Sequence, residues 1–263
     1  MTPAGMTQAA LLSVENVTLR FGGLQVLRGL SFAVRDGSIS SLIGPNGAGK
    51  TSVFNCLTGF YRPNAGMIRF LGQSIAGMRP HRITRLGLAR TFQNLRLFKE
   101  MTALENVMAG LHCRTHSGLV GAMLHAPAQQ REEAASLQAG ERWLAFAGIA
   151  RHRDRAAGNL SYGDQRRVEW ARALATSPKL LLLDEPAAGL NHDEKEQLIA
   201  LIRRVREELG VTVLLIEHDM GLVMRVSEAI TVLDYGQKIA EGDAETVQND
   251  PRVIEAYLGR EED

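Results

Sequence analysis

The residues best suited to chemistry form a glycine-rich segment, GPNGAGKTS, at positions 44–52. An apolar run at 38–43 precedes it, and apolar residues at helical spacing follow from Lys50 onward. Glycines let a backbone approach a ligand closely, and the N–H groups at the start of a helix attract an anion. The segment fits the phosphate-binding pattern G-x-x-x-x-G-K-[ST], in which Lys50 reaches the β- and γ-phosphates of a nucleotide and Thr51 ligates Mg²⁺. Nucleotide contacts are therefore predicted at Gly44, Pro45, Asn46, Gly47, Ala48, Gly49, Lys50, Thr51 and Ser52.

Two acids at the end of a leucine run could serve the same ligand. Positions 180–185 read LLLLDE, and four consecutive leucines favour a strand covered on both faces. Asp184 would then emerge at the carboxyl end of a parallel strand, where ligands bind in open α/β sheets and where an acid holds Mg²⁺. Glu185 beside it could orient and deprotonate an attacking water. By themselves, the two acids could equally be a solvated strand end.

A third segment with chemical potential begins at Asn159 and reads NLSYGDQRRVEWARAL. Ser161 is a good N-cap for the helix that the pattern predicts, and Gly163 permits close approach to an anion. A well-capped helix without a ligand is the simpler interpretation. That interpretation gives no reason for the sequence SYGDQ just before the strand that ends in two acids.

Length and composition favour one large domain, or one domain with an inserted sub-domain, because 263 residues of 45% hydrophobic content can build a sizeable core. The formal net charge of +1 gives no electrostatic case for nucleic acid as a partner. Two cysteines, Cys56 and Cys113, make neither a disulfide framework nor a metal site, which suits a reducing compartment. We predict Cys56 to be a small buried hydrophobe. The N-terminal segment lacks the features of a signal peptide, and no run of 18 apolar residues occurs.

The elements that must position these motifs change character along the chain. Short apolar runs at 11–43 and 66–76 predict an antiparallel β layer, and residues 100–176 predict helices, the first with Thr102 and Glu105 at capping-box spacing. After residue 178, buried strands followed by helices return, and a late hairpin precedes a terminal helix. The predicted fold class is α/β, with a parallel core sheet, an antiparallel β layer on one side and an inserted helical sub-domain.

The segment LSYGDQ resembles the LSGGQ signature motif of ATP-binding cassette (ABC) ATPases, a group of P-loop NTPases. Phe21 matches the family's adenine-stacking aromatic, and Gln93 in RTFQN matches the Q-loop glutamine. Asp184 and Glu185 match the Walker B pair, residues 187–191 the D-loop, and His218 the switch histidine. The resemblance implies that Lys50, Gln93, Glu185 and His218 are catalytic, that Thr51, Gln93 and Asp184 hold Mg²⁺, and that Phe21, Ser161 and Gly163 bind ATP. Three positions depart from the family pattern: Tyr162, Asp164 and Asn191.

A closer resemblance covers nearly the whole chain. LARTFQNLRLFKEMTALENV, an insertion at 112–130, LDEPAAGLN, LLIEHDM and the EAYLG tail are similar to the longer ATP-binding subunit of bacterial branched-chain amino acid importers. That resemblance implies an ABC ATPase domain at 11–250, a helical sub-domain at about 95–176 and a C-terminal helical tail at 251–263.

The implied partners are two transmembrane permease subunits, a second ATP-binding cassette (a related subunit or the same chain) and, indirectly, a substrate-binding protein. The implied cofactors are ATP and Mg²⁺, and the location is peripheral, on the cytoplasmic face of the bacterial inner membrane. Each ATP would lie between the phosphate loop of one cassette and the signature motif of the other.

Other functions remain open from the residues. The cargo could be different, such as urea or exported lipopolysaccharide, although RTFQN and the 112–130 insertion favour the amino acid importer. A soluble ABC ATPase acting on DNA or ribosomes usually carries coiled coils or duplicated cassettes, which this sequence lacks. A P-loop kinase would phosphorylate a small acceptor, but it gives no reason for the signature segment or for His218.

Overall fold

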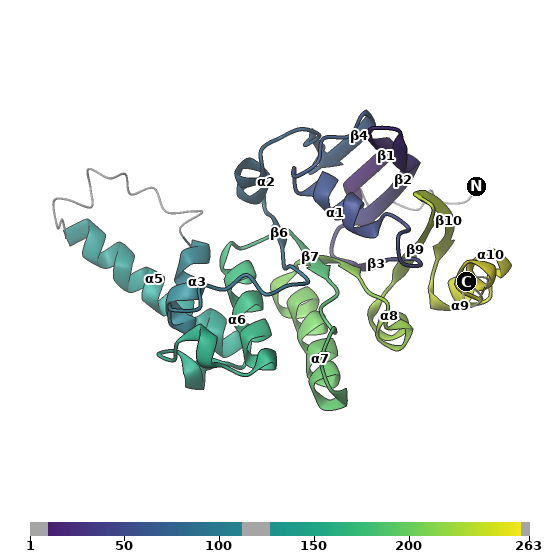
Figure 1. Cartoon of the computed structure of the whole chain (residues 1–263). Coiled ribbons are helices and arrows are strands. Elements are labelled where there is room, and N and C mark those ends of the chain that lie inside the picture. The colour runs from purple at the N-terminus through teal and green to yellow at the C-terminus, as the bar shows by residue number, and fades with distance from the viewer. Residues whose placement is uncertain (1–9, 112–126, 259–263) are drawn as a thin grey trace, which may run out of the picture.

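The computed structural model describes residues 10–111 and 127–258 (Figure 1). Cys113, most of the predicted 112–130 insertion and the last five residues of the predicted tail lie outside the described residues. Within the described part, the chain forms two sheets and a group of helices at one end, well away from the antiparallel strands (Figure 1).

The central sheet has the strand order β10-β9-β3-β8-β7-β6, and only β10 runs antiparallel to its neighbour. In β7, Leu180 and Leu182 join the core on one face, whereas Leu181 and Leu183 join the core on the other. The leucine run is therefore a strand buried on both faces, as predicted. The strands of this sheet are β3 (Ile39–Ile43), β6 (Leu88–Arg90), β7 (Leu180–Asp184), β8 (Thr212–Ile216), β9 (Ala229–Asp234) and β10 (Gln237–Gly242).

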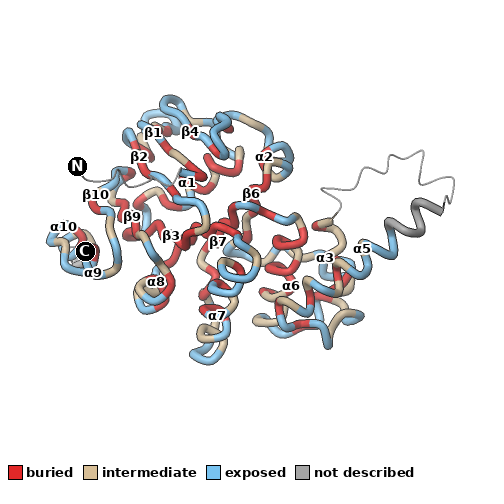
Figure 2. Tube along the Cα trace, turned by 180° about the vertical axis from the view of Figure 1, so that it is seen from behind, coloured by how far each residue is buried: buried red, intermediate tan, exposed pale blue. Residues whose placement is uncertain are grey.

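A smaller antiparallel sheet, in the order β2-β1-β4-β5, covers one side of the molecule. Helix α1 (Lys50–Leu57) is placed between the two sheets, because its Phe54 and Leu57 share one buried cluster with Leu12 of β1 and Leu42 of β3. Figure 2 shows the resulting buried layer through the middle of the molecule. The strands are β1 (Ala10–Phe21), β2 (Leu24–Arg35), β4 (Ala65–Phe70) and β5 (Gln73–Ser74).

The opposite face of the central sheet carries the second core cluster. Its largest helix is α7 (His192–Leu209), which buries Leu198, Ile199, Ile202 and Val205 at helical spacing. The other helices of the core region are short: α2 (Pro80–Leu86), α8 (Met220–Val226), α9 (Ala244–Gln248) and α10 (Pro251–Leu258). Within residues 10–111 and 127–258, no helix has the length and apolar character of a membrane span.

The helical group consists of α3 (Ala103–Leu111), α5 (Pro127–Phe146) and α6 (Tyr162–Ala175), with two 3₁₀ turns at Ala150–His152 and Ala157–Asn159. It has a buried cluster of its own, which includes Val107, Leu144 and Val168. The predicted capping box before α3 is present: the Thr102 N–H donates to Glu105 Oε2 at 2.7 Å, and the Glu105 N–H donates to Thr102 Oγ1 at 3.1 Å. In the chain this group lies between β6 and β7, which pair with each other as neighbouring parallel strands of the central sheet.

Candidate nucleotide-binding site

The phosphate loop joins β3 to α1, and its glycines are required by space as well as by conformation. Gly44 has φ +147°, and a Cβ on it would lie 2.1 Å from the Leu233 carbonyl oxygen. Gly49, the N-cap of α1, has φ +103°, and its Cβ would lie 3.0 Å from Leu27 Cδ2. The loop is therefore pressed against β2 and β9 by its backbone, in a shape that other residues would not fit.

Lys50 is 8% exposed and lies across this loop. Its Nζ donates to the Gly44 carbonyl at 2.6 Å and to the Pro45 carbonyl at 2.9 Å. The ammonium group is thereby held against the phosphate loop, which leads into the N-terminus of α1, where the helix dipole attracts anions. Cation, amides and dipole together form a site suited to phosphate.

The candidate catalytic side chains converge on Glu185, directly after β7. Gln93 Nε2 donates to Glu185 Oε2 at 2.8 Å, and His218 Nδ1 lies 3.8 Å from the same oxygen. Because β8 lies between β3 and β7, the phosphate loop, His218 and the two acids all follow carboxyl ends of adjacent strands. Glu185 also has φ +47°, an uncommon conformation for a non-glycine residue and a form of strain typical of active sites.

Asp184 has a buried cationic partner that sequence reasoning missed. Arg90 Nη2 lies 2.6 Å from Asp184 Oδ2, and both side chains are only 6% exposed. Arg90 also donates to Asn55 Oδ1 of α1 at 2.8 Å and lies over the Phe92 ring. It ties the phosphate-loop helix to the strand that ends in the acid pair. Arg90 is the first residue of the motif RTFQN, but only the pairing of β6 with β7 reveals its contact with Asp184.

Glu217 is the second residue that was missed. It is fully buried, and its carboxylate accepts from the Ala187 N–H at 2.7 Å and from the His218 N–H at 3.0 Å. It therefore fixes the D-loop relative to the histidine. The available signal was an acid at the end of the apolar run VTVLLIE, where a buried carboxylate must find donors.

Phe21 ends β1 and is 46% exposed, so it is not a core residue. Its ring packs against the edge of Tyr61, with 5.0 Å between the ring centroids. The second aromatic ring was not predicted. Phe21 at the end of β1 and the partly buried Tyr61 in the loop after α1 thus form an aromatic pair, and such rings are suited to stacking on a base.

The signature residues contact α6 and α7. Ser161 caps α6, and its hydroxyl accepts from the Asp164 N–H at 3.2 Å, as predicted. A Cβ on Gly163 would lie 2.6 Å from Glu194 Oε1 of α7, so Gly163 packs directly against that side chain. Asn191, a departure from the family pattern, is the N-cap of α7 and forms a complete capping box with Glu194.

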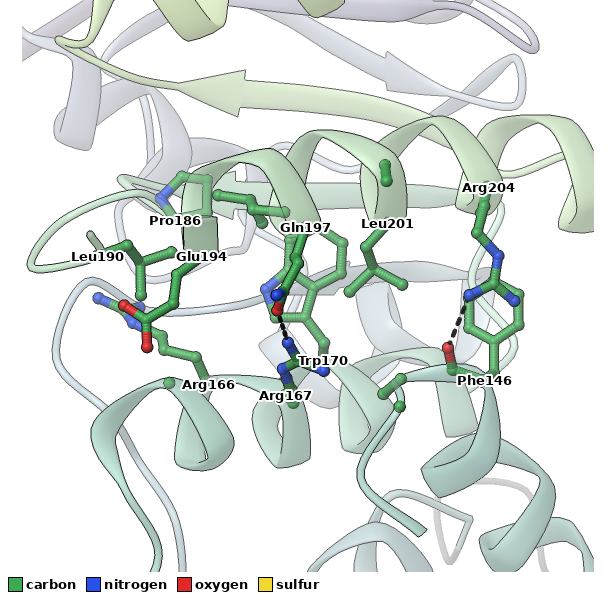
Figure 3. A pocket seen from close by; sticks show the side chains of 15 residues that line it. Phe146, Arg166, Arg167, Trp170, Pro186, Leu190, Glu194, Gln197, Leu201 and Arg204 are labelled. Carbon is green, nitrogen blue, oxygen red and sulfur yellow. Dashed lines mark hydrogen bonds between the residues drawn. The ribbon is translucent and has the colours of Figure 1, made fainter. Parts of the chain in front are cut away.

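The seam between α6 and α7 holds a cavity of about 240 Å³ (Figure 3). Trp170, Leu198 and Leu201 give it apolar walls, and two arginines bridge it at the rim. Arg167 donates to Gln197, and Arg204 donates to the Phe146 carbonyl at 3.2 Å (Figure 3). The helical group thus meets α7 through an incompletely filled seam with side-chain bridges.

Cys56 is 1% exposed, and burial raises the pKa of its thiol to about 12. It is a buried small hydrophobe, as predicted. Among residues 10–111 and 127–258, no group of three or more His, Cys, Asp or Glu residues is arranged to hold a metal ion. Mg²⁺ usually binds through one or two protein oxygens together with substrate phosphates. The oxygen donors of Thr51 and Asp184 fit that mode of binding.

Comparison with known proteins gives the family. Residues 27–188 match the family model described as "ABC transporter", and residues 237–263 match the model described as "Branched-chain amino acid ATP-binding cassette transporter". The chain is 48% identical to the high-affinity branched-chain amino acid transport ATP-binding protein BraF of Pseudomonas aeruginosa, over 95% of this chain and 98% of the relative. It is 47% identical, with the same coverage, to the transport ATP-binding protein LivG of Escherichia coli.

The solved structure of an ATP-binding cassette of an ABC transporter, in its ADP conformation, is also similar. It has a TM-score of 0.83 and 34% identity, over 96% of this chain and all of the other. The predicted α/β cassette fold is confirmed. The chain belongs to the ABC transporter family, as an ATP-binding cassette with a C-terminal segment of the branched-chain amino acid transporter type.

Proposed function

We propose that this chain hydrolyses ATP to power an importer of branched-chain amino acids. The assignment of branched-chain amino acids as the cargo is supported by the near full-length identity of 48% to BraF and by the match of the C-terminal segment. ATP hydrolysis as the reaction is supported by the convergence of Gln93 and His218 on Glu185 beside the phosphate loop.

In the proposed reaction, Glu185 accepts a proton from the water that attacks the γ-phosphorus. Gln93 holds the carboxylate and connects it to the Q-loop, and His218 contacts the γ-phosphate. Lys50 balances charge on the β- and γ-phosphates in the transition state. When bound, Mg²⁺ would be held by Thr51, Asp184 and Gln93 and would neutralise charge that develops on the phosphate oxygens. Phe21, supported by Tyr61, stacks on adenine.

The proposed active unit is a pair of cassettes, the second being a related subunit or the same chain. Ser161 and Gly163 make their contacts with α6 and α7 rather than with the phosphate loop. This arrangement supports a role for them on a nucleotide bound by the partner. ATP would thereby join two surfaces, and hydrolysis would release them.

A groove beside the Q-loop supports docking of the permease subunits. It has a volume of about 150 Å³, and Phe60, Pro80, Ile83 and Phe92 line it. Around it lie exposed cations of α2 and the Q-loop (Arg79, Arg82, Arg85, Arg96), and no Asp or Glu occurs in the sequence between Asp36 and Glu100. An apolar residue flanked by acids on a cytoplasmic permease loop fits this surface. A substrate-binding protein would act through the permeases, and the chain would lie peripherally on the cytoplasmic face of the bacterial inner membrane.

The decisive experiment is Glu185→Gln, which keeps shape and hydrogen-bonding reach but accepts no proton. Loss of such a base typically lowers the rate by about 10²–10⁴-fold. The variant should bind ATP and accumulate as a cassette dimer with ATP but not with ADP, measured by size-exclusion chromatography beside a phosphate-release assay. The partner cassette must be present if the native pair is mixed. Normal hydrolysis by the variant would remove Glu185 from the mechanism.

The cargo is tested separately, by purifying the wild-type chain from native membranes. Co-purification of two permeases and transport of leucine, isoleucine or valine by the reconstituted complex would support the proposal. A complex that transports only another solute would contradict the assignment of branched-chain amino acids as the cargo and would leave the proposed ATPase mechanism intact.

A further inference from the structure

Two buried charged residues of α6 fasten the backbone of the Q-loop. Arg166 donates from Nη1 to the Phe92 carbonyl at 3.0 Å and from Nη2 to the Gln93 carbonyl at 2.8 Å. Glu169 Oε1 accepts from the Phe92 N–H at 3.4 Å. Arg166 is 4% exposed and Glu169 is 2% exposed, so solvent cannot substitute for these bonds. The position of Gln93 therefore follows helix α6.

A contribution to the stability of the fold does not by itself explain why Arg166 and Glu169 are buried together. Arg166 Nη1 lies 3.7 Å from Glu169 Oε2, and within the described residues both Arg166 Nε and Glu169 Oε2 lack a hydrogen-bond partner. Burial raises the pKa of Glu169, although Arg166 and Arg172 oppose that shift. A buried ion pair with incomplete hydrogen bonding is a weak source of stability compared with apolar packing. A role in placing the Q-loop accounts better for the pair.

Tyr162 holds the other side of Arg166. Its hydroxyl accepts from Arg166 Nη2 at 2.7 Å, and the Arg166 guanidinium carbon lies 5.2 Å from the centroid of its ring. The same ring borders the D-loop, because a Cβ on Gly189 would lie 3.3 Å from Tyr162 Cε1. Tyr162 stands where the LSGGQ motif has a glycine, which could make none of these contacts. One departure from the family pattern thus joins the signature motif, the Q-loop and the D-loop.

We propose that Tyr162 is a positioning residue for Gln93, acting through Arg166. It holds the guanidinium so that the Gln93 carbonyl is fixed and the Gln93 side chain reaches Glu185 at 2.8 Å. A displacement of the D-loop at Gly189, as when a partner cassette closes on it, is then transmitted through the Tyr162 ring to the catalytic carboxylate. The inference rests on the proposed ATPase function and names a coupling device within that site.

The first variant is Tyr162→Phe, which removes the hydroxyl and keeps the ring beside Arg166 and Gly189. We expect kcat for ATP hydrolysis to fall on the order of tenfold, the effect of losing one hydrogen bond to a charged group. The KM for ATP should change less than about twofold, because the substitution leaves the phosphate loop and Phe21 untouched. The melting temperature should stay the same within a few degrees.

The same substitution is then made in a Gln93→Ala background. If Tyr162 acts through Gln93, it has nothing left to position there, and kcat should not fall further. Arg166→Lys keeps the charge, but one ammonium cannot span two carbonyls and a phenol as the guanidinium fork does. It should lower kcat more than Tyr162→Phe does, and again only when Gln93 is present.

Equal losses from Tyr162→Phe with and without Gln93, or an unchanged kcat in the otherwise wild-type chain, would overturn the positioning role. A wild-type chain that hydrolyses no ATP, alone or with its partner cassette, would contradict the proposed function instead. The two failures are therefore distinguishable, and Tyr162→Phe keeps the test available even if Arg166→Lys does not fold.

Discussion

The phosphate loop and the Q-loop each hold a residue with a proposed catalytic role, Lys50 and Gln93, but by different means. The phosphate loop is fixed by its backbone: Gly44 and Gly49 have positive φ values and almost no space beside them. The Q-loop is fixed by side chains, since Arg166 and Glu169 reach across from α6 to the backbone at Phe92 and Gln93. The first arrangement tolerates little change, whereas the second can shift when α6 shifts.

This contrast suits the two tasks. Phosphate must meet the same amides and the same cation in every cycle, so a rigid cradle is an advantage. In the proposed function the Q-loop connects the site to the permease subunits, and a linkage through one helix suits that task. The seam between α6 and α7, beside this linkage, is incompletely filled. Substitutions should therefore have severe effects in the first region and graded effects in the second.

The largest effect is expected for Gly44→Ala. Its Cβ would lie 2.1 Å from a backbone oxygen, which no side-chain adjustment can relieve. We expect the free energy of unfolding to fall by about 4 kcal/mol or more, because single substitutions cause losses of this size only when they create severe strain or overpacking. The control is Gly22→Ala, which also has positive φ but no atom within 4 Å of the added Cβ. Chemical denaturation of both variants measures the difference, and similar stabilities would contradict a rigid phosphate loop.

Lys50→Ala tests the cation of the same region without altering its backbone. Removing a preorganised charge from a transition state typically lowers kcat by about 10²–10³-fold. Nucleotide binding should also weaken, while the melting temperature changes little. Lys238→Ala, on the surface of β10 and paired with Glu241, is the matched control. Unchanged turnover of Lys50→Ala, in protein free of contaminating ATPases, would rule out this phosphate site.

Phe21→Ala tests the outer rim of the site, where a side chain rather than the backbone is expected to bind the nucleotide. Stacking of an aromatic ring on a base is worth about 1–3 kcal/mol, so the KM for ATP should rise more than kcat falls. Phe21→Tyr keeps the ring and should retain the wild-type KM. If Phe21→Ala instead melts at a much lower temperature with unchanged ATP affinity, the ring is structural.

The smallest effect is expected at Asn191, the D-loop residue that caps α7. Asn191→Ala removes the cap of α7 and should cost about 1 kcal/mol, or about 2–4 °C in melting temperature for a chain of this size. Asn191→Asp keeps a capping oxygen and should be neutral. Calorimetry separates the two variants. If Asn191→Asp destabilises as much as Asn191→Ala, the departure from the family's aspartate has a role other than capping.

Several features of the fold followed from local sequence. The leucine run at 180–183 predicted a strand buried on both faces, and Ser161 and Thr102 predicted helix starts, because burial pattern and caps depend on neighbouring residues. Helix α2 and strand β6 were not predicted. Strand β6 has only three residues, and its pairing with β7 rather than its own pattern makes it a strand.

The phosphate loop, the acid pair at the end of β7 and the family could be predicted from the sequence, because these depend on residue types at short, fixed spacing. The partners of those residues could not be predicted, because they come from distant parts of the chain. Arg90 and Asp184 are 94 positions apart, and Arg166 and Phe92 are 74 positions apart. Whether such residues meet depends on strand pairing and on how α6 packs against the core, neither of which is encoded in local spacing. For the same reason, the contact of the Tyr162 ring with Gly189 of the D-loop depends on how the chain folds.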